Sequence, residues 1–125
     1  MFSKLFSKNE VSVGWNNLDS ISQLSEIDEV SQKKPVLIFK HSTRCPISTM
    51  ALSRFERSFN EEANFTPYFL DLISFREISN GVAEKYAVIH ESPQALLISN
   101  GKSIYDSSHN GIDFEEINEK AKSLS

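Results

Sequence analysis

A run of four apolar residues, Val36 to Phe39, constrains the fold of this 125-residue chain more than any other feature. A strand that is apolar at every position is buried on both faces, as in a sheet that helices cover on each side. Lys33-Lys34-Pro35 precedes the run, and the residue before a proline avoids helical geometry. The run therefore predicts the central strand of an α/β domain.

The polar turn after this strand contains the only cysteine, Cys45. An apolar stripe that starts with Ile47 and Met50 predicts a helix from there to Phe59. Pro46 fits the first helical position, where a missing N–H group has no cost. The start of a helix offers free N–H groups and the positive end of the helix dipole, and both favour a thiolate. We therefore predict a site at Cys45 that favours thiol chemistry.

Strand and helix patterns alternate over the first two thirds of the chain. Apolar spacing predicts strands at residues 11–15, 36–39 and 68–73, and helices at residues 18–30, 47–59 and 74–86. Capping-box spacing supports two of the helix starts, at Ser20-Gln23 and at Ser74-Glu77. This order favours a parallel central sheet with helices on its faces.

The last third predicts an antiparallel addition to the sheet. Strands over 95–99 and 103–107 flank Asn100-Gly101, a dipeptide typical of a tight hairpin turn. Asp113 then caps a final helix that presents one apolar face, formed by Phe114, Ile117, Ala121 and Leu124. No linker or repeat interrupts the pattern, so we expect a single domain over residues 1–125, with residues 1–10 as a loosely ordered tail.

Charge and cysteine content exclude several classes of function. The net charge of −4 argues against a nucleic-acid partner, because phosphate binding needs a basic surface. One cysteine cannot form an internal disulfide, and the first residues lack the apolar core of a signal peptide or spanning helix, so we expect a cytoplasmic protein without a membrane partner. One cysteine and three scattered histidines have no zinc-site spacing, so no metal is expected.

The predicted order of elements, with Ser92-Pro93 before the hairpin, resembles the thioredoxin fold. This resemblance implies a thioredoxin-like α/β fold whose central mixed sheet combines parallel strands with a C-terminal antiparallel hairpin. In that fold the active cysteine opens the long helix after the central strand. A cis proline faces the cysteine across the substrate groove, and Pro93 matches it by position.

The chain is similar in more detail to the YtxJ-like monothiol bacilliredoxins. Two segments, residues 39–48 and 90–94, carry this resemblance, and Trp15 with Leu18, residues 71–73 and residues 76–80 add weaker support. The resemblance implies a cytoplasmic thiol–disulfide oxidoreductase that removes the small thiol bacillithiol from mixed disulfides with proteins. It implies Cys45 as the nucleophile, thiol-modified proteins as partners, and bacillithiol or a similar small thiol as co-substrate, with no bound cofactor.

Ser48 stands where a dithiol protein has its second cysteine. A Cys-x-x-Cys protein resolves its mixed disulfide internally, and this chain cannot. After Cys45 attacks the small thiol's sulfur, that thiol stays on Cys45 until a second thiol from outside removes it. The sequence therefore predicts a one-cysteine cycle.

The residues around Cys45 have supporting roles that the sequence leaves open. Arg44 supplies positive charge and is either solvated or in contact with an acidic group of a ligand, and Thr43 is expected to shape the turn. Ser48 either donates a hydrogen bond to the thiolate or caps the backbone nearby. From the turn and helix start alone, a buried and inert cysteine is as good an interpretation of Cys45, and the resemblance favours the reactive one.

The expected substrate groove contains His41, His90 and Ser92 beside Pro93. His41 is either half of a Cys–His pair or a structural or solvent-facing group at the strand end. His90 lies in the loop before the proline. The backbone of Ser92 is expected to pair with an extended substrate chain, with the Ser92–Pro93 bond in the cis form.

Two other functions stay open from the sequence. One is an iron–sulfur cluster carrier, in which Cys45 and an external thiol would hold a cluster between two chains; Pro46-Ile47 departs from the small or aromatic residues of such carriers. The other is a non-catalytic adaptor that binds partners through the groove at Pro93. The oligomeric state is not predicted.

Overall fold

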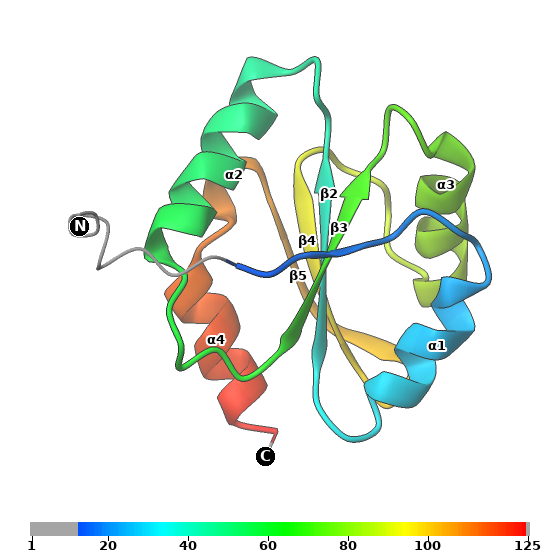
Figure 1. The fold of residues 1–125 in the computed structure, drawn as a ribbon, viewed down its shortest axis with the longest axis vertical. Helices are drawn as coiled ribbons and strands as arrows, with labels where there is room; N and C mark the ends of the chain where they lie inside the picture. Colours follow the sequence, from blue (N-terminus) through cyan, green and yellow to red (C-terminus); the bar gives the residue numbers. More distant parts are fainter. Residues whose placement is uncertain (1–12, 125) are drawn as a thin grey trace.

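A computed structural model of the chain describes residues 13–124. The strands are Asn16–Asn17 (β1), Val36–His41 (β2), Thr66–Asp71 (β3), Gln94–Ser99 (β4) and Lys102–Ser108 (β5). The helices are Gln23–Val30 (α1), Pro46–Ser58 (α2), Arg76–Tyr86 (α3) and Phe114–Lys122 (α4), with a 3-10 turn at His109–Gly111 (η2). Figure 1 shows the sheet between two helical layers, α2 and α4 on one face and α1 and α3 on the other. The expected segment 1–10 lies outside the described residues.

The strands form one mixed sheet in the order β1-β3-β2-β4-β5. The central strand β2 runs parallel to β3 and antiparallel to β4, and β5 completes the C-terminal hairpin. At the hairpin turn Asn100 and Gly101 both have positive φ, 53° and 75°, as a type I′ turn requires. The predicted parallel sheet with an antiparallel addition is thus confirmed.

Each face of β2 packs against its own core. Val36 and Ile38 lie in the cluster under α1 and α3, whereas Leu37 and Phe39 lie in the cluster under α2 and α4. The second cluster is rich in aromatic rings, and Trp15 packs at its edge with its ring centroid 5.8 Å from that of Phe39. Because both faces are covered, the strand has no position for a solvated side chain, which accounts for its unbroken apolar run.

The first strand is shorter and later than expected. The strand predicted at 11–15 is wrong over the described residues 13–15, because β1 is Asn16–Asn17, which pair with Tyr68 and Phe69 of β3. Trp15, just before β1, turns its ring into the aromatic core. The apolar character of Trp15 therefore reflects its packing against the core and not a place in a strand.

Two of the predicted helix starts also differ. α1 begins at Gln23 instead of residue 18, although the Gln23 side chain does accept the Ser20 N–H at 2.8 Å, which is half of a capping box. The Ser74-Glu77 box is wrong, because the Ser74 hydroxyl donates to Asp71 at the end of β3. The N-cap residue of α3 is instead Phe75, and no side chain accepts a hydrogen bond from the first N–H groups of the helix.

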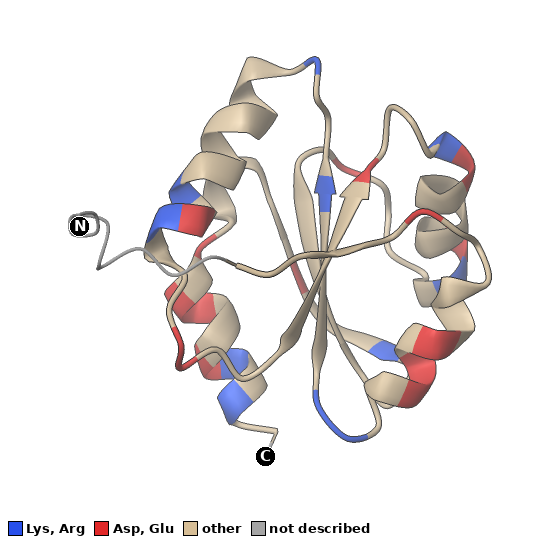
Figure 2. Ribbon diagram, viewed as in Figure 1, with Lys and Arg blue, Asp and Glu red and all other residues tan. Residues whose placement is uncertain are grey.

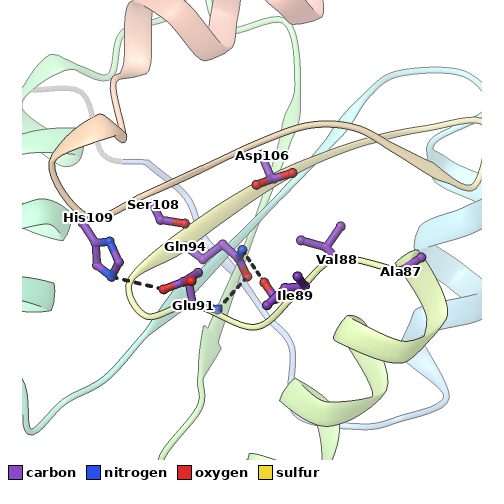
Figure 3. A pocket seen from close by; sticks show the side chains of 8 residues that line it. All are labelled: Ala87, Val88, Ile89, Glu91, Gln94, Asp106, Ser108 and His109. Carbon is purple, nitrogen blue, oxygen red and sulfur yellow. Dashed lines mark hydrogen bonds and ion pairs between the residues drawn. The ribbon is translucent and has the colours of Figure 1, made fainter.

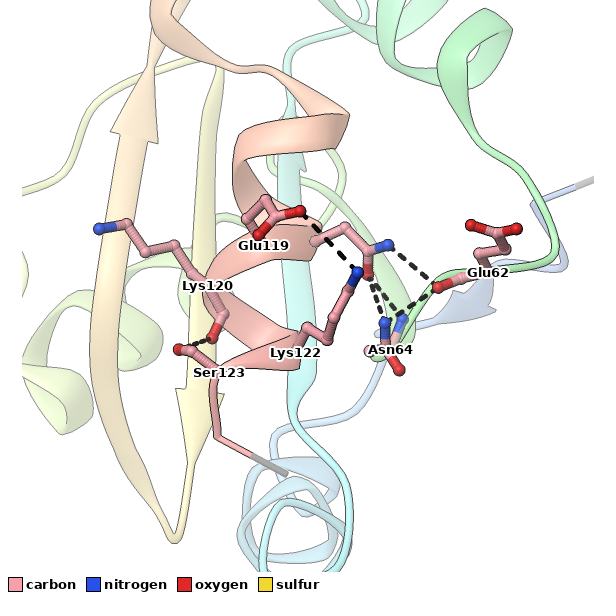
Figure 4. Close-up of polar contacts among 7 residues, drawn as sticks. Glu62, Asn64, Glu119, Lys120, Lys122 and Ser123 are labelled. Carbon is pink, nitrogen blue, oxygen red and sulfur yellow. Dashed lines mark hydrogen bonds and ion pairs between the residues drawn. The ribbon is translucent and has the colours of Figure 1, made fainter.

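The last helix starts as predicted. The Asp113 carboxylate accepts the N–H of Glu116 at 2.9 Å. Farther along this helix, Asn118 donates to the Glu62 carbonyl at 3.0 Å and accepts the Asn64 N–H at 2.7 Å (Figure 4). These contacts tie the loop after α2 to α4, and so hold the far end of the helix that begins at Cys45.

The apolar stripe of α2 begins later than expected. Ile47 and Met50 are 56% and 67% exposed, whereas Ala51 and Phe55 are buried. In Figure 1 the first turn of α2 lies beyond the ends of the strands, and among residues 46–49 only Ser48 is buried. Leu124, expected on the face of α4, is also exposed, at 44%.

Candidate active site

Cys45 is the N-cap residue of α2, with extended backbone angles (φ −114°, ψ 118°) and a partly exposed side chain. Its carbonyl accepts the Thr49 N–H at 3.0 Å, the first hydrogen bond of the helix. Pro46 is the first helical residue, as its fixed φ favours. By helix geometry the N–H groups of Ile47 and Ser48 have no carbonyl partner within the helix, so they point toward the open N-terminal end.

The turn before Cys45 is short and exposed at its tip. The Cys45 N–H donates to the Ser42 carbonyl at 3.2 Å, which closes the turn around Thr43 and Arg44. Both of these side chains are exposed. Figure 2 shows basic colour on this loop and acidic colour at the end of the neighbouring strand β3, where Asp71 lies. Arg44 therefore supplies charge at the rim of the site.

Ser48 is fully buried and lies in a small hydrogen-bond network. Its hydroxyl oxygen accepts the Ser42 N–H at 3.0 Å and lies 2.7 Å from Nδ1 of His41. Both partners come from the end of β2, so the network joins the central strand to the first turn of α2. This is a local backbone contact of the kind expected for Ser48, together with a histidine contact that was not expected.

His41 lies inside the protein, 6% exposed, and its ring packs against Phe69 of β3 with centroids 5.7 Å apart. Burial lowers the pKa of the imidazole from its usual value, against smaller opposing effects from Asp71 and Glu56. The ring is therefore neutral at pH 7. This interior placement differs from the expected role in lining the groove and matches the structural interpretation of this histidine.

The Ser92–Pro93 peptide bond is cis, as predicted. The buried Gln94 side chain holds the preceding loop, because its Nε2 donates to the Ile89 carbonyl at 3.0 Å and its Oε1 accepts the Glu91 N–H at 3.4 Å. The Ser92 hydroxyl oxygen is buried without a hydrogen-bond partner among the described residues.

His90, in the same loop, is exposed. Burial of part of its ring lowers its pKa, and the positive charges of Lys40 and Arg76 lower it further. His90 is therefore a neutral, accessible group beside the proline at pH 7. The expected groove residues His90 and Ser92 thus share one loop with Pro93.

Lys40 is a further unusual residue of this region. Its side chain is fully buried next to Gln94 in the sheet register, and its ammonium nitrogen has no hydrogen-bond partner among the described residues. Burial lowers the pKa of Lys40 to about 8, against a smaller opposing effect from Glu91. The only sequence signal for this burial is the place of Lys40 directly after four apolar residues.

A cavity of about 530 Å³ lies behind the loop before Pro93 (Figure 3). Its lining includes Gln94 and Asp106. It also includes Glu91 and His109, which form an ion pair with 3.6 Å between Oε1 of Glu91 and Nε2 of His109. Cys45 is not part of this lining, so the cavity is separate from the thiol chemistry. Among residues 13–124, no group of three or more His, Cys, Asp or Glu side chains is arranged to hold a metal ion.

Comparison with known families decides which chemistry this arrangement serves. The family model described as monothiol bacilliredoxin BrxC matches residues 16–117. This chain belongs to that family. The matched range contains both Cys45 and Pro93, and the single cysteine of this bacilliredoxin fits a monothiol enzyme.

Solved structures agree with this assignment. A protein provisionally described as an oxidoreductase with a thioredoxin fold is 32% identical, with a TM-score of 0.71 over 85% of this chain and 91% of its own. Thioredoxin from Malassezia sympodialis is 18% identical, with a TM-score of 0.66 over 91% of this chain and 92% of its own. Thioredoxin from Schistosoma mansoni is 19% identical, with a TM-score of 0.65 over 92% of this chain and all of its own. At such identities the two thioredoxins show the fold alone.

The fold is therefore thioredoxin-like, as predicted, and this bacilliredoxin is a thiol–disulfide oxidoreductase. None of the helices within residues 13–124 combines the length and apolar character needed to cross a membrane.

Proposed function

We propose that this bacilliredoxin uses Cys45 to remove bacillithiol, or a closely similar small thiol, from mixed disulfides with proteins in the cytoplasm. The observation that carries the proposal is the position of Cys45. It is a partly exposed N-cap residue, and it has the only thiol group of the chain. The free N–H groups of the first turn favour the thiolate there, with Arg44 as a second source of positive charge. Thiol-modified proteins and the small thiol are the proposed partners.

The proposed reaction has two exchange steps. The Cys45 thiolate attacks the small-thiol sulfur of the mixed disulfide, forms a new S–S bond to it, and releases the protein thiolate, which takes up a proton. A second small thiol, as its thiolate, then attacks the small-thiol sulfur on Cys45, forms a symmetric small-molecule disulfide, and releases the Cys45 thiolate. Over both steps the protein sulfur is reduced from disulfide to thiol, and the second small thiol is oxidised as it enters the new disulfide.

The groove beside Cys45 is proposed to hold the substrate chain. We propose that the backbone of Ser92 pairs with a substrate strand, a short form of strand addition. His90 offers a neutral, exposed imidazole at the same loop. We propose that these groups and Pro93 orient the mixed disulfide so that its small-thiol sulfur faces Cys45.

Intact-protein mass spectrometry tests this proposal. Reduced protein is mixed with a purified protein that carries one bacillithiol adduct. We expect the substrate to lose the adduct and wild-type Cys45 to gain it. With the Cys45→Ser variant we expect the substrate to keep its adduct and the variant to gain none. Ser25→Ala, which changes an exposed residue of α1, should behave as wild type. A substrate that keeps its adduct in the presence of wild-type protein contradicts the proposal.

A parallel substrate with a glutathione adduct tests the identity of the small thiol. If bacillithiol is the natural adduct, its transfer is faster at equal concentrations. Equal rates for the two adducts would contradict selectivity for bacillithiol while leaving the role of Cys45 intact. Cys45→Ser protein that still removes the adduct would contradict the nucleophilic role of Cys45.

A further inference from the structure

We propose that His41 is a positioning residue that acts through Ser48. Its Nδ1 atom accepts the Ser48 hydroxyl hydrogen and so prevents that hydroxyl from donating to the sulfur of Cys45. The inference rests on the proposed function in one respect, that Cys45 is the reacting thiol. It assigns a role to the serine that stands where a resolving cysteine would be.

The hydrogen-bond capacity of Ser48 carries this assignment. A serine hydroxyl has one hydrogen to donate and two lone pairs. One lone pair receives the Ser42 N–H, and the remaining contact is His41 Nδ1 at 2.7 Å. If Nδ1 carried a hydrogen, the buried Ser48 hydrogen would need another acceptor, and the hydrogen bonds of the described residues include none. If Ser48 donates to an Nδ1 atom without hydrogen, the Ser48 hydroxyl, the Ser42 N–H group and Nδ1 each have a hydrogen-bond partner.

The surroundings of His41 agree with a neutral ring protonated on Nε2. The ring is buried against Phe69, and the acidic groups that face it are Asp71 on β3 and Glu56 on α2. Desolvation outweighs both carboxylates and lowers the pKa of the imidazole. A neutral imidazole carries one ring hydrogen, and we assign it to Nε2. Nδ1 is then free to accept.

Cys45 and Ser48 are close neighbours in the first turn of α2. They occupy the N-cap and third helical positions, the pair whose side chains and N–H groups meet in a capping box. No hydrogen bond joins the Ser48 and Cys45 side chains in the structure, and a hydroxyl released from His41 would be free to turn toward the sulfur three residues earlier. With that hydrogen held by His41, the thiolate depends on the N–H groups of the helix end, and Pro46 contributes none.

The pH dependence of alkylation at the single cysteine tests the assignment. Iodoacetamide reacts with the thiolate, so the midpoint of rate against pH reports how readily the thiol ionises. In His41→Phe the released hydroxyl donates to the sulfur, and we expect the midpoint to fall by about one pH unit, an increase of roughly tenfold in the thiolate-to-thiol ratio. His41→Asn keeps an acceptor near the Nδ1 position and should keep the wild-type midpoint.

Ser48→Ala distinguishes the two possible roles of the hydroxyl. We expect this variant to keep the wild-type midpoint, and the double variant His41→Phe with Ser48→Ala to return to it. A rise of the midpoint in Ser48→Ala would show that the hydroxyl already donates to the thiolate and would overturn the proposal. An unchanged midpoint in folded His41→Phe would also overturn it. Ser53→Ala, farther along α2, is the matched control.

Nitrogen-15 NMR of the wild-type imidazole provides a test that needs no variant. We expect the chemical shifts of a ring with hydrogen on Nε2 and none on Nδ1 at pH 7. A hydrogen on Nδ1 would contradict the proposal even if His41→Phe does not fold. Alkylation and NMR use no disulfide substrate, so their failure would leave the adduct-transfer experiment unaffected, and a failed adduct transfer would leave the tautomer measurement valid.

Discussion

The buried ammonium of Lys40 is costly in the central strand. Its pKa of about 8, against an ordinary value of 10.5, corresponds to a penalty of about 3 kcal/mol for the charged form at neutral pH. Lys40→Met keeps the length of the side chain and removes the charge. We expect this variant to have a larger free energy of unfolding than wild type at pH 7, measured by urea denaturation.

The pH dependence of the stability gained by Lys40→Met tests whether the charge of Lys40 is the cause of that gain. Between about pH 8 and 10.5 the folded lysine loses its proton before the unfolded one does, so the unfolded state binds more protons and wild-type stability rises with pH. The penalty is fully present below pH 8. The stability difference between Lys40→Met and wild type should therefore shrink from pH 7 to pH 10. A constant difference would indicate that packing, not charge, is responsible.

Replacing Ser48 by cysteine tests the one-cysteine cycle directly. Ser48→Cys creates a Cys-x-x-Cys sequence in the first turn of α2, and a second thiol there can resolve the adduct on Cys45. After reaction with a bacillithiol-modified protein, we expect intact mass to show an internal disulfide in place of the adduct. Because a thiol is a weak hydrogen-bond partner for Ser42 and His41, we also expect a loss of about 1–3 kcal/mol in the free energy of unfolding.

Survival of the adduct in Ser48→Cys would contradict this prediction and would mean that the new thiol cannot reach Cys45. The stability of the reduced variant, measured separately, shows whether the hydrogen-bond network has been lost.

Helix α2 has two parts that respond differently to substitution. Met50 is 67% exposed in the open first turns, whereas Phe55 is buried in the aromatic core. We expect Met50→Gln to change the free energy of unfolding by no more than about 0.5 kcal/mol, and Phe55→Ala to reduce it by about 3–5 kcal/mol. Urea denaturation of both variants checks this contrast, and a large loss in Met50→Gln would contradict it.

The elements that local chemistry specifies could be predicted from the sequence. Val36 to Phe39 form a central strand, Asn100-Gly101 form the hairpin turn, and Asp113 caps the last helix. Where another hydrogen-bond partner lies nearby, spacing alone was insufficient. Ser74 bonds to Asp71 and does not cap α3, although its spacing to Glu77 fits a capping box.

The candidate site was predictable to a similar extent. The turn, the helix start at Pro46 and the cis bond at Pro93 follow from the sequence and its resemblance to a family. The contact between His41 and Ser48 does not, because it depends on how the end of β2 meets α2 in space. The burial of Lys40 likewise depends on tertiary structure, because its neighbour in the sheet, Gln94, comes from far along the chain.

The whole molecule assembles its site from distant parts of the chain. Cys45 follows β2. One of the two strands adjacent to β2 in the sheet is β4, which begins only at Gln94. The carbonyl of Pro93 in turn accepts the His109 N–H at 3.0 Å, after the hairpin has returned. On the ribosome, where synthesis runs from the N-terminus, the thiol thus emerges well before the loop at Pro93, which we propose to lie across the substrate groove from it. A nascent chain exposes a sulfur beside an unpaired strand edge until most of the protein has been made.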